Sequence, residues 1–282
     1  MERVNAWNKY DEAAKKQVFD FAEDYRSFIS LCKTERECVK EGVRLLEAAG
    51  YKNLEEVIAA GEKLSAGDKV YAVNMNKALV AFNIGEEPVE SGMNILGAHI
   101  DSPRLDIKQN PLYEETGLVL LDTHYYGGIK KYQWVATPLA LHGVVVLKDG
   151  TTVNVVIGED MNDTVVGISD LLIHLASEQM DKKASKVVEG EALDILVGSM
   201  PAKQDDTDKS ENKDSGKDAV KKNILAILKD KYGIEEEDFL SAELEAVPAG
   251  PARDYGIDRS MIIGYGHDDR VCAYPSLIAL IN

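Results

Sequence analysis

The feature that most constrains the fold is a short apolar run at residues 93–98 (MNILGA), which changes at once into the polar sequence HIDSP. The run has no helical period and is bounded by glycine and proline, a pattern that predicts a strand buried on both faces. Such strands are typical of α/β sheets, in which ligands bind at the carboxyl ends of the strands. The sequence therefore predicts an α/β fold with a functional site directly after this strand.

His99 and Asp101 occupy that position. Residues two apart on an extended segment point to the same side, so the Asp101 carboxylate can reach the ring nitrogen of His99 that does not bind a metal. A carboxylate placed in this way fixes the tautomer of a metal-binding histidine and raises its basicity. A single histidine at a strand end is also often a structural residue, so a metal site needs further ligands elsewhere in the chain.

A second acidic group stands near the end of the sequence, where HDDR at residues 267–270 follows a glycine-rich stretch and precedes an expected apolar helix. Two interpretations of Asp268 and Asp269 remain open. Aspartate is favoured at helix N-termini, where it caps main-chain N–H groups and suits the helix dipole. The same carboxylates could instead supply ligands to the metal that His99 would bind.

Apolar residues at three- and four-residue spacing predict helices, and a capping box of Thr34 and Glu37 begins one of them. The predicted helices span residues 11–31, 35–48, 54–64, 164–180 and 222–232. The predicted strands span residues 70–73 and 78–84, which form a hairpin, and residues 118–122, 139–147, 153–157 and 241–248. A turn at residues 148–150 (KDG) indicates a second hairpin.

The composition excludes several classes of protein. A formal net charge of −17 is opposite to that of nucleic-acid-binding proteins and unsuited to an anionic membrane, so neither partner is expected. The three cysteines fit no zinc-finger spacing and are expected to be reduced thiols. Because the N-terminus lacks a signal-peptide pattern and no apolar run approaches about 18 residues, the sequence predicts a cytoplasmic protein.

Five segments resemble, in the same order, segments of the aspartyl aminopeptidase family, the family-eighteen metallo-aminopeptidases. They are residues 97–103 (GAHIDSP), 126–128 (YGG), 139–144 (LALHGV), 168–175 (ISDLLIHL) and 268–274 (DDRVCAY). Residues 123–134 (THYYGGIKKYQW) look like the bacterial branch. The resemblance covers the whole chain, but the family continues for many residues beyond this point, so only its N-terminal part is matched.

The resemblance implies an incomplete zinc-peptidase-like α/β lobe that is interrupted by an inserted β-rich oligomerisation domain. Residues 1–105 would form the first part of the catalytic lobe, and residues 239–282 would resume it. Residues 106–238 would form the inserted domain, including a mobile polar loop at about 202–222.

The resemblance also implies roles for individual residues. His99 would be a metal ligand, Asp101 would act in catalysis by orienting it, and Asp268 would bridge two metal ions. His267 matches no family ligand, and Asp269 and Arg270 are expected to be structural. His174 and His124 could each reach the active site of a neighbouring subunit, and His174 is the candidate for substrate binding. For both histidines an ordinary surface or core role is the alternative.

The implied function is the hydrolysis of N-terminal residues, acidic ones included, from peptides. The implied cofactors are two divalent metal ions, with zinc favoured over manganese or cobalt, and the implied assembly is a homo-oligomer. The sequence has no glutamate after Asp268, where the family places its general base, so we expect the chain to be inactive alone. The alternative is a non-catalytic oligomer subunit or structural paralogue.

Overall fold

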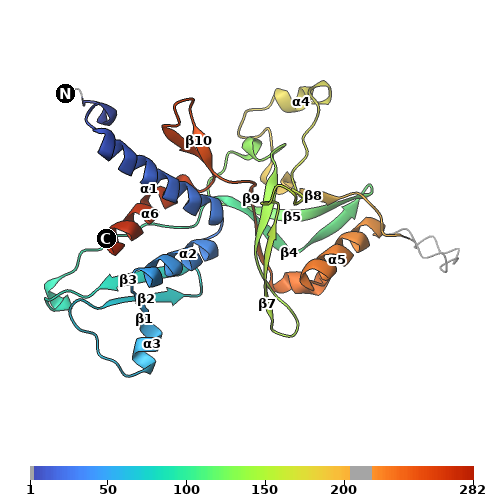
Figure 1. Ribbon diagram of the computed structural model, residues 1–282. Helices are drawn as coiled ribbons and strands as arrows, with labels where there is room; N and C mark the ends of the chain where they lie inside the picture. The colour runs from blue at the N-terminus through green and yellow to red at the C-terminus, as the bar shows by residue number, and fades with distance from the viewer. Residues whose placement is uncertain (1–2, 204–217) are drawn as a thin grey trace. The chain divides into compact units, whose positions relative to one another are not determined.

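Figure 1 shows the computed structural model of the chain, which describes residues 3–203 and 218–282. The chain divides into two compact units. The first unit comprises residues 1–102 and 251–282, and the second unit comprises residues 103–250. Both contain helices and strands, so the chain has the mixed α/β fold that the sequence predicts.

The division into units differs in position from the domain boundaries expected at residues 106 and 238. It falls after Ser102 and after Gly250, because the strand β9 (Glu243–Pro248) belongs to the sheet of the second unit. Most of the segment expected to be mobile, residues 202–222, lies outside the described residues.

The helices of the first unit begin where the sequence places its capping residues. Asp11 caps α1 (Glu12–Leu31), and Thr34 and Glu37 form the expected capping box of α2 (Glu35–Ala48). The unit also contains the helical segments η1 (Ala6–Asn8), α3 (Leu54–Ala59) and α6 (His267–Ile281). Figure 1 shows α1 beside α6. Apolar side chains between these helices form a core of Tyr25, Phe28, Ile29, Cys32, Cys38, Ala252 and Tyr274.

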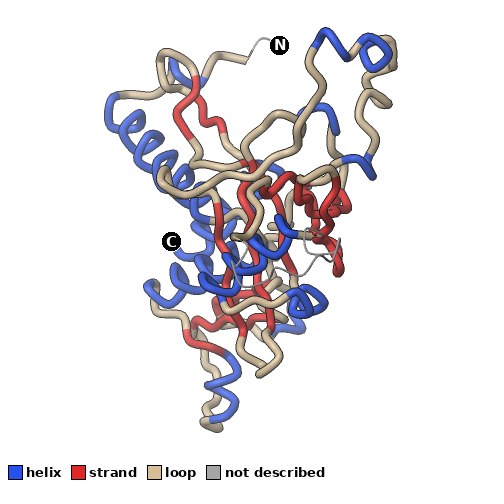
Figure 2. Tube along the Cα trace, turned by 90° about the vertical axis from the view of Figure 1, so that its right-hand side faces the viewer, coloured by secondary structure: helices blue, strands red, loops and turns tan. Residues whose placement is uncertain are grey.

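The strands of the first unit form two small sheets (red in Figure 2). The predicted hairpin is present as β2 (Lys69–Asn74) and β3 (Ala78–Asn83), and the short β1 (Lys52–Asn53) pairs with β2 in parallel. The second sheet is the hairpin of β10 (Arg253–Tyr255) and β11 (Met261–Ile263).

The strand predicted at residues 93–98 is absent from the described structure, and this prediction was wrong. Apart from the short 3-10 helix η2 (Val89–Ser91), residues 84–103 belong to no helix or strand. Ile95 is 78% exposed and Leu96 is 62% exposed. A strand buried on both faces needs a hydrogen-bonded neighbour and a layer on each side, and among the described residues no strand pairs with this segment.

The second unit is built on a six-stranded antiparallel sheet in the order β7-β6-β9-β4-β5-β8. Its strands are β4 (Arg104–Glu115), β5 (Leu118–Tyr126), β6 (Leu139–Val146), β7 (Thr152–Ile157), β8 (Ile195–Gly198) and β9. The helix α5 (Ala219–Tyr232) packs on β4, β5 and β8 (Figure 1), and Gly233 ends it in the left-handed region, as expected. The turn at residues 148–150 joins β6 to β7.

The prediction of a long helix at residues 164–180 was also wrong. The structure has only η4 (Ile173–Leu175) and α4 (Ser177–Met180) there. Residues 166–168 are held extended by isolated bridges from Val166 to Leu139 and from Ile168 to Val135, so they cannot enter a helix.

The remaining short segments are η3 (Lys131–Gln133), η5 (Gly190–Ala192) and η6 (Glu236–Ser241). No helix in the described ranges is both long enough and apolar enough to cross a membrane.

Gly143 provides a test of the sheet of the second unit. It has φ 145° and lies opposite Leu244, and a Cβ at this position would be 1.9 Å from the main-chain oxygen of Glu243. We expect Gly143→Ala to lower the free energy of unfolding by about 3 kcal/mol or more, because it combines overpacking with a disfavoured φ.

Gly150→Ala is the matched control. Gly150 also has a positive φ, 86°, but nothing lies within 4 Å of its Cβ position, so we expect a loss of about 1 kcal/mol. Urea denaturation followed by the fluorescence of the buried Trp134, in a Trp7→Phe background, measures both losses. Equal losses for the two variants would contradict the packing described for Gly143.

Candidate metal centre

The imidazole of His99 lies between two carboxylates of the first unit. Its Nδ1 is 3.3 Å from Oδ1 of Asp101, and its Nε2 is 3.3 Å from Oδ1 of Asp268. The structure therefore brings together the three residues that the sequence selected, although Asp268 is far from the other two along the chain. The side chain of His99 is about half exposed, and that of Asp268 is 86% exposed, so both can be reached from solvent.

The contacts of Asp101 favour one tautomer of His99. Nδ1 is also 3.0 Å from the main-chain oxygen of Asp101, and two acceptors beside one nitrogen favour a proton on it. The lone pair of Nε2 then faces Asp268. Partial burial lowers the pKa of His99, but the hydrogen bond to the Asp101 main chain and the negative charges of Asp101, Asp269 and Asp268 outweigh it, and the net effect is a raised pKa.

The pair of His99 and Asp268 fits a zinc ion in its chemistry and spacing. Zinc binds histidine nitrogen and carboxylate oxygen at about 2.0–2.2 Å, so two ligands of one tetrahedral ion are about 3.4 Å apart. The distance between Nε2 of His99 and Oδ1 of Asp268 is 3.3 Å. Within the described residues, no third His, Cys, Asp or Glu joins these two atoms in a three-donor group, so the described pair is an incomplete site.

The backbone around Asp268 departs from the helix that follows it. Asp268 and Asp269 have non-helical φ/ψ angles and are joined by a cis peptide bond. The hydroxyl of Ser102 donates a hydrogen bond of 2.8 Å to the main-chain oxygen of Asp268. The phenol of Tyr265 donates one of 3.4 Å to the main-chain oxygen of Ser102. These contacts hold the backbone next to the Asp268 carboxylate, and the sequence did not reveal Ser102 and Tyr265 because no spacing rule indicates them.

His267 is an interior residue of the first unit and is not among the three residues of the candidate site. Its Nδ1 is 2.9 Å from the phenol oxygen of Tyr25, while its Nε2 is buried and has no hydrogen-bond partner among the described residues. Burial raises the pKa of Tyr25 to about 12, even though the nearby charge of Arg270 lowers it. His267 thus packs beside Tyr25, in agreement with its lack of a matching ligand in the family.

The two other candidate histidines lie in the second unit. His124 is on β5, with its ring stacked on that of Tyr125 and its Nδ1 4.0 Å from Glu191. His174 is in η4 and is exposed. Both are accessible, and neither belongs to the unit that contains His99.

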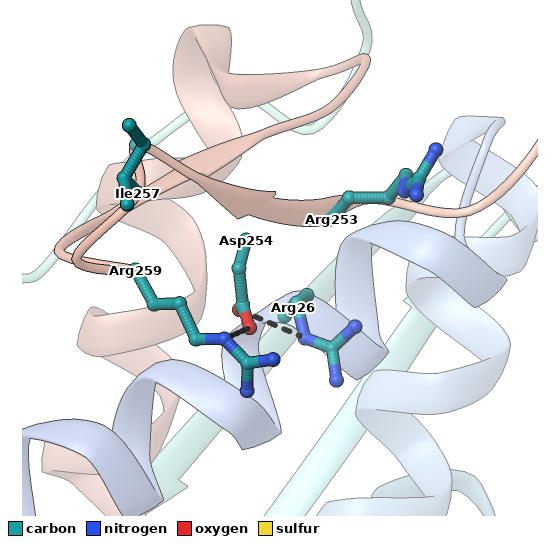
Figure 3. A pocket seen from close by; sticks show the side chains of 6 residues that line it. Arg26, Arg253, Asp254, Ile257 and Arg259 are labelled. Atoms are coloured by element: carbon teal, nitrogen blue, oxygen red, sulfur yellow. Dashed lines mark ion pairs between the residues drawn. The ribbon is translucent and has the colours of Figure 1, made fainter.

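A basic pocket of the first unit is built from different residues (Figure 3). It is lined by Arg26, Arg253, Asp254, Gly256, Ile257 and Arg259. The Asp254 carboxylate lies between two guanidinium groups, 3.8 Å from Arg26 and 3.8 Å from Arg259. Exposed ion pairs at such distances contribute little free energy. The pocket shares no residue with the group around His99.

Comparison with known proteins gives a consistent result. The family described as "Aminopeptidase I zinc metalloprotease (M18)" matches residues 28–282. A Clostridium acetobutylicum protein named "Probable M18 family aminopeptidase 1" is 61% identical over 281 residues, which are 100% of this chain and 58% of that protein. The crystal structure of an M18-family aminopeptidase from Thermotoga maritima has a TM-score of 0.89 at 43% identity, over 100% of this chain and 58% of that chain.

A more distant structure, the mApe1 dodecamer of S. cerevisiae, shares the fold alone. Its TM-score is 0.66 at 21% identity, over 94% of this chain and 56% of that chain. This chain thus spans 58% of the length of the Clostridium and Thermotoga relatives that it matches.

The geometry predicts weak zinc binding that depends on the three residues of the site. Two protein ligands cannot close a tetrahedral site, so we expect an affinity far below that of a complete centre, lost in His99→Ala and in Asp268→Ala. Asp101→Ala should weaken binding about 10–100-fold, because the orienting contact to Nδ1 is removed. Isothermal titration calorimetry measures these changes.

The control for this prediction is Asp230→Ala, which removes an exposed carboxylate from α5 and should leave zinc binding unchanged. Tight binding of two zinc ions per chain that persists in Asp268→Ala would show that the ligands lie elsewhere.

Proposed function

This chain belongs to the aminopeptidase I zinc metalloprotease (M18) family, and we propose that its first unit is part of a metal-dependent aminopeptidase centre that acts on peptides. The observation that carries the proposal is the position of His99, with Asp101 at 3.3 Å from one ring nitrogen and Asp268 at 3.3 Å from the other. Peptides with acidic N-terminal residues are the proposed substrates, following the resemblance to aspartyl aminopeptidases.

Each residue of the centre has a distinct proposed role. His99 and Asp268 hold the metal, with Asp268 bridging two ions, and Asp101 acts in catalysis through the orientation of His99. When bound, divalent metals lower the pKa of a water molecule and polarise the scissile carbonyl. Zinc is supported by the description of the family, and manganese or cobalt would suit the same donor atoms.

We assign the second unit to assembly. It presents a run of exposed apolar side chains, including Leu172 at 70% and Leu175 at 71% exposure, and exposed apolar runs mark protein interfaces. A structure with the same fold is a dodecamer. In a homo-oligomer formed through this unit, His174, which lies within the same run, is the proposed substrate-binding residue for the centre of a neighbouring copy.

A non-catalytic oligomer subunit is the second candidate function. It is favoured by the two-donor character of the described pair. The two functions differ in whether this polypeptide hydrolyses peptides, and they share the same assembly through the second unit.

We expect the 282-residue polypeptide to release no measurable N-terminal aspartate or glutamate from peptides in the presence of zinc. Two protein ligands cannot close a tetrahedral zinc site, so the described pair of His99 and Asp268 is expected to hold metal too weakly for turnover. A fluorogenic aminopeptidase assay measures the rate. Release that is abolished both by a chelator and by His99→Ala would contradict this expectation and favour the catalytic function for the polypeptide alone.

The assembly proposal predicts a closed homo-oligomer, because the exposed run at residues 171–175 needs a partner surface. Light scattering at micromolar concentration should give one species of dimer size or larger, and Leu172→Asp should reduce its mass. Ile257→Asp, which changes an even more exposed apolar side chain of the first unit, is the control and should leave the mass unchanged. A stable monomer, or aggregates without a defined mass, would contradict assembly through this surface.

A further inference from the structure

Arg270 connects the segment that carries His99 to the start of α6. Its side chain is completely buried, with 0% exposure. Its Nε donates a hydrogen bond of 2.9 Å to the main-chain oxygen of Ile100. Ile100 is the residue between His99 and Asp101, and Arg270 is two residues after Asp268. The hydrogen bond therefore joins the two segments that carry the candidate site.

The other two nitrogen atoms of the guanidinium donate to main-chain oxygens just after the end of α1. Nη1 donates to the main-chain oxygen of Cys32 at 2.7 Å, and Nη2 donates to that of Lys33 at 3.0 Å. A buried charge is tolerated only when its hydrogen-bonding groups are paired, and here each of the three nitrogen atoms has a carbonyl acceptor. Arginine presents its donors from three nitrogen atoms in a rigid planar fork, whereas lysine carries all its donors on one nitrogen atom.

Gly266 leaves the space that the guanidinium occupies. Its φ is 90°, and a Cβ at this position would be 2.3 Å from Nη1 of Arg270. The glycine that precedes HDDR in the sequence is therefore required by the close approach of Arg270 as well as by its own backbone conformation.

Ser102 makes the second connection between the two segments. It is 3% exposed, and its hydroxyl donates to the main-chain oxygen of Asp268 at 2.8 Å. The hydrogen bonds of Arg270 and Ser102 therefore join residues 100–102 to residues 268–270 at two points close to the facing pair of His99 and Asp268. Neither bond involves the atoms that would bind a metal.

We propose that Arg270 and Ser102 are positioning residues of the metal centre, which set the separation between Nε2 of His99 and Oδ1 of Asp268. This inference rests on the proposed function, because it concerns the affinity of that pair for a metal. Metal ligands must lie within about 0.2 Å of their ideal distances, and two main-chain anchors beside the ligand residues restrict the backbone movements that would separate them. An arginine with a purely structural role would stabilise the first unit without altering metal affinity at a given folded fraction.

The first test compares two serine substitutions of the same chemical kind. Ser102→Ala removes the bond to Asp268 and should lower the affinity for Co²⁺ or Zn²⁺ about 10-fold. Ser30→Ala is the control, because Ser30 also makes two main-chain hydrogen bonds in the first unit, to Arg26 and Ala252, but contacts neither segment of the site. Calorimetry on the folded chain gives the affinities, and circular dichroism confirms the folded fraction.

Arg270→Lys should lower the metal affinity about 10–100-fold, and it should alter the visible absorption spectrum of bound Co²⁺, which reports ligand geometry. Ser102→Thr keeps the hydroxyl and should retain most of the affinity. If Arg270→Lys does not fold, the comparison of Ser102→Ala with Ser102→Thr and Ser30→Ala decides the question.

The outcomes separate this inference from the proposed function. If the unmodified chain binds no metal, the proposed metal centre fails and the positioning role fails with it. If the unmodified chain binds metal and the folded Ser102→Ala variant binds equally well, only the positioning role is overturned. An equal loss in Ser30→Ala would likewise overturn it, because the effect would then reflect the general stability of the first unit.

Discussion

The buried guanidinium of Arg270 is the interaction on which the first unit depends. A buried charge without partners is too costly to keep, so folding must bring main-chain oxygens to it, from Cys32 and Lys33 after α1 and from Ile100. The hydrogen bonds of this one guanidinium connect three parts of the chain that are distant in the sequence. His99 and Asp268 each lie within two positions of a residue in this network, which is the basis of the positioning role proposed for Arg270.

The second unit can interrupt the first because its own sheet brings its two ends together. β4 begins two residues after Ser102, and β9 ends just before the chain returns to the first unit. The two strands are antiparallel neighbours, with Leu105 opposite Ala246. Leu105 and Ala246 are fully buried in the core of the second unit. The two ends of this unit are therefore held together by its own sheet and core.

Two apolar stretches lie at the surface, although their patterns predict burial. They are residues 93–98 in the first unit and residues 171–175 in the second. Scattered exposed apolar residues are normal in folded proteins, whereas consecutive ones mark surfaces that bind another protein surface. An apolar pattern in a sequence indicates that a segment tends to be covered, but it does not tell whether the cover is its own fold or another protein surface. This is why the predicted strand and helix were wrong at these two stretches.

What the sequence determined by itself is local. The spacing of two between His99 and Asp101 placed a carboxylate beside Nδ1, the capping box of Thr34 and Glu37 began α2, and the glycine at 233 ended α5, because each depends on a few neighbouring residues. Only the tertiary structure decided that Asp268 faces Nε2 of His99, across a separation that no periodicity spans. It also decided the roles of Ser102 and Arg270, because hydrogen bonds to main-chain oxygens can be made with any residue type and leave no mark on the sequence of the acceptor.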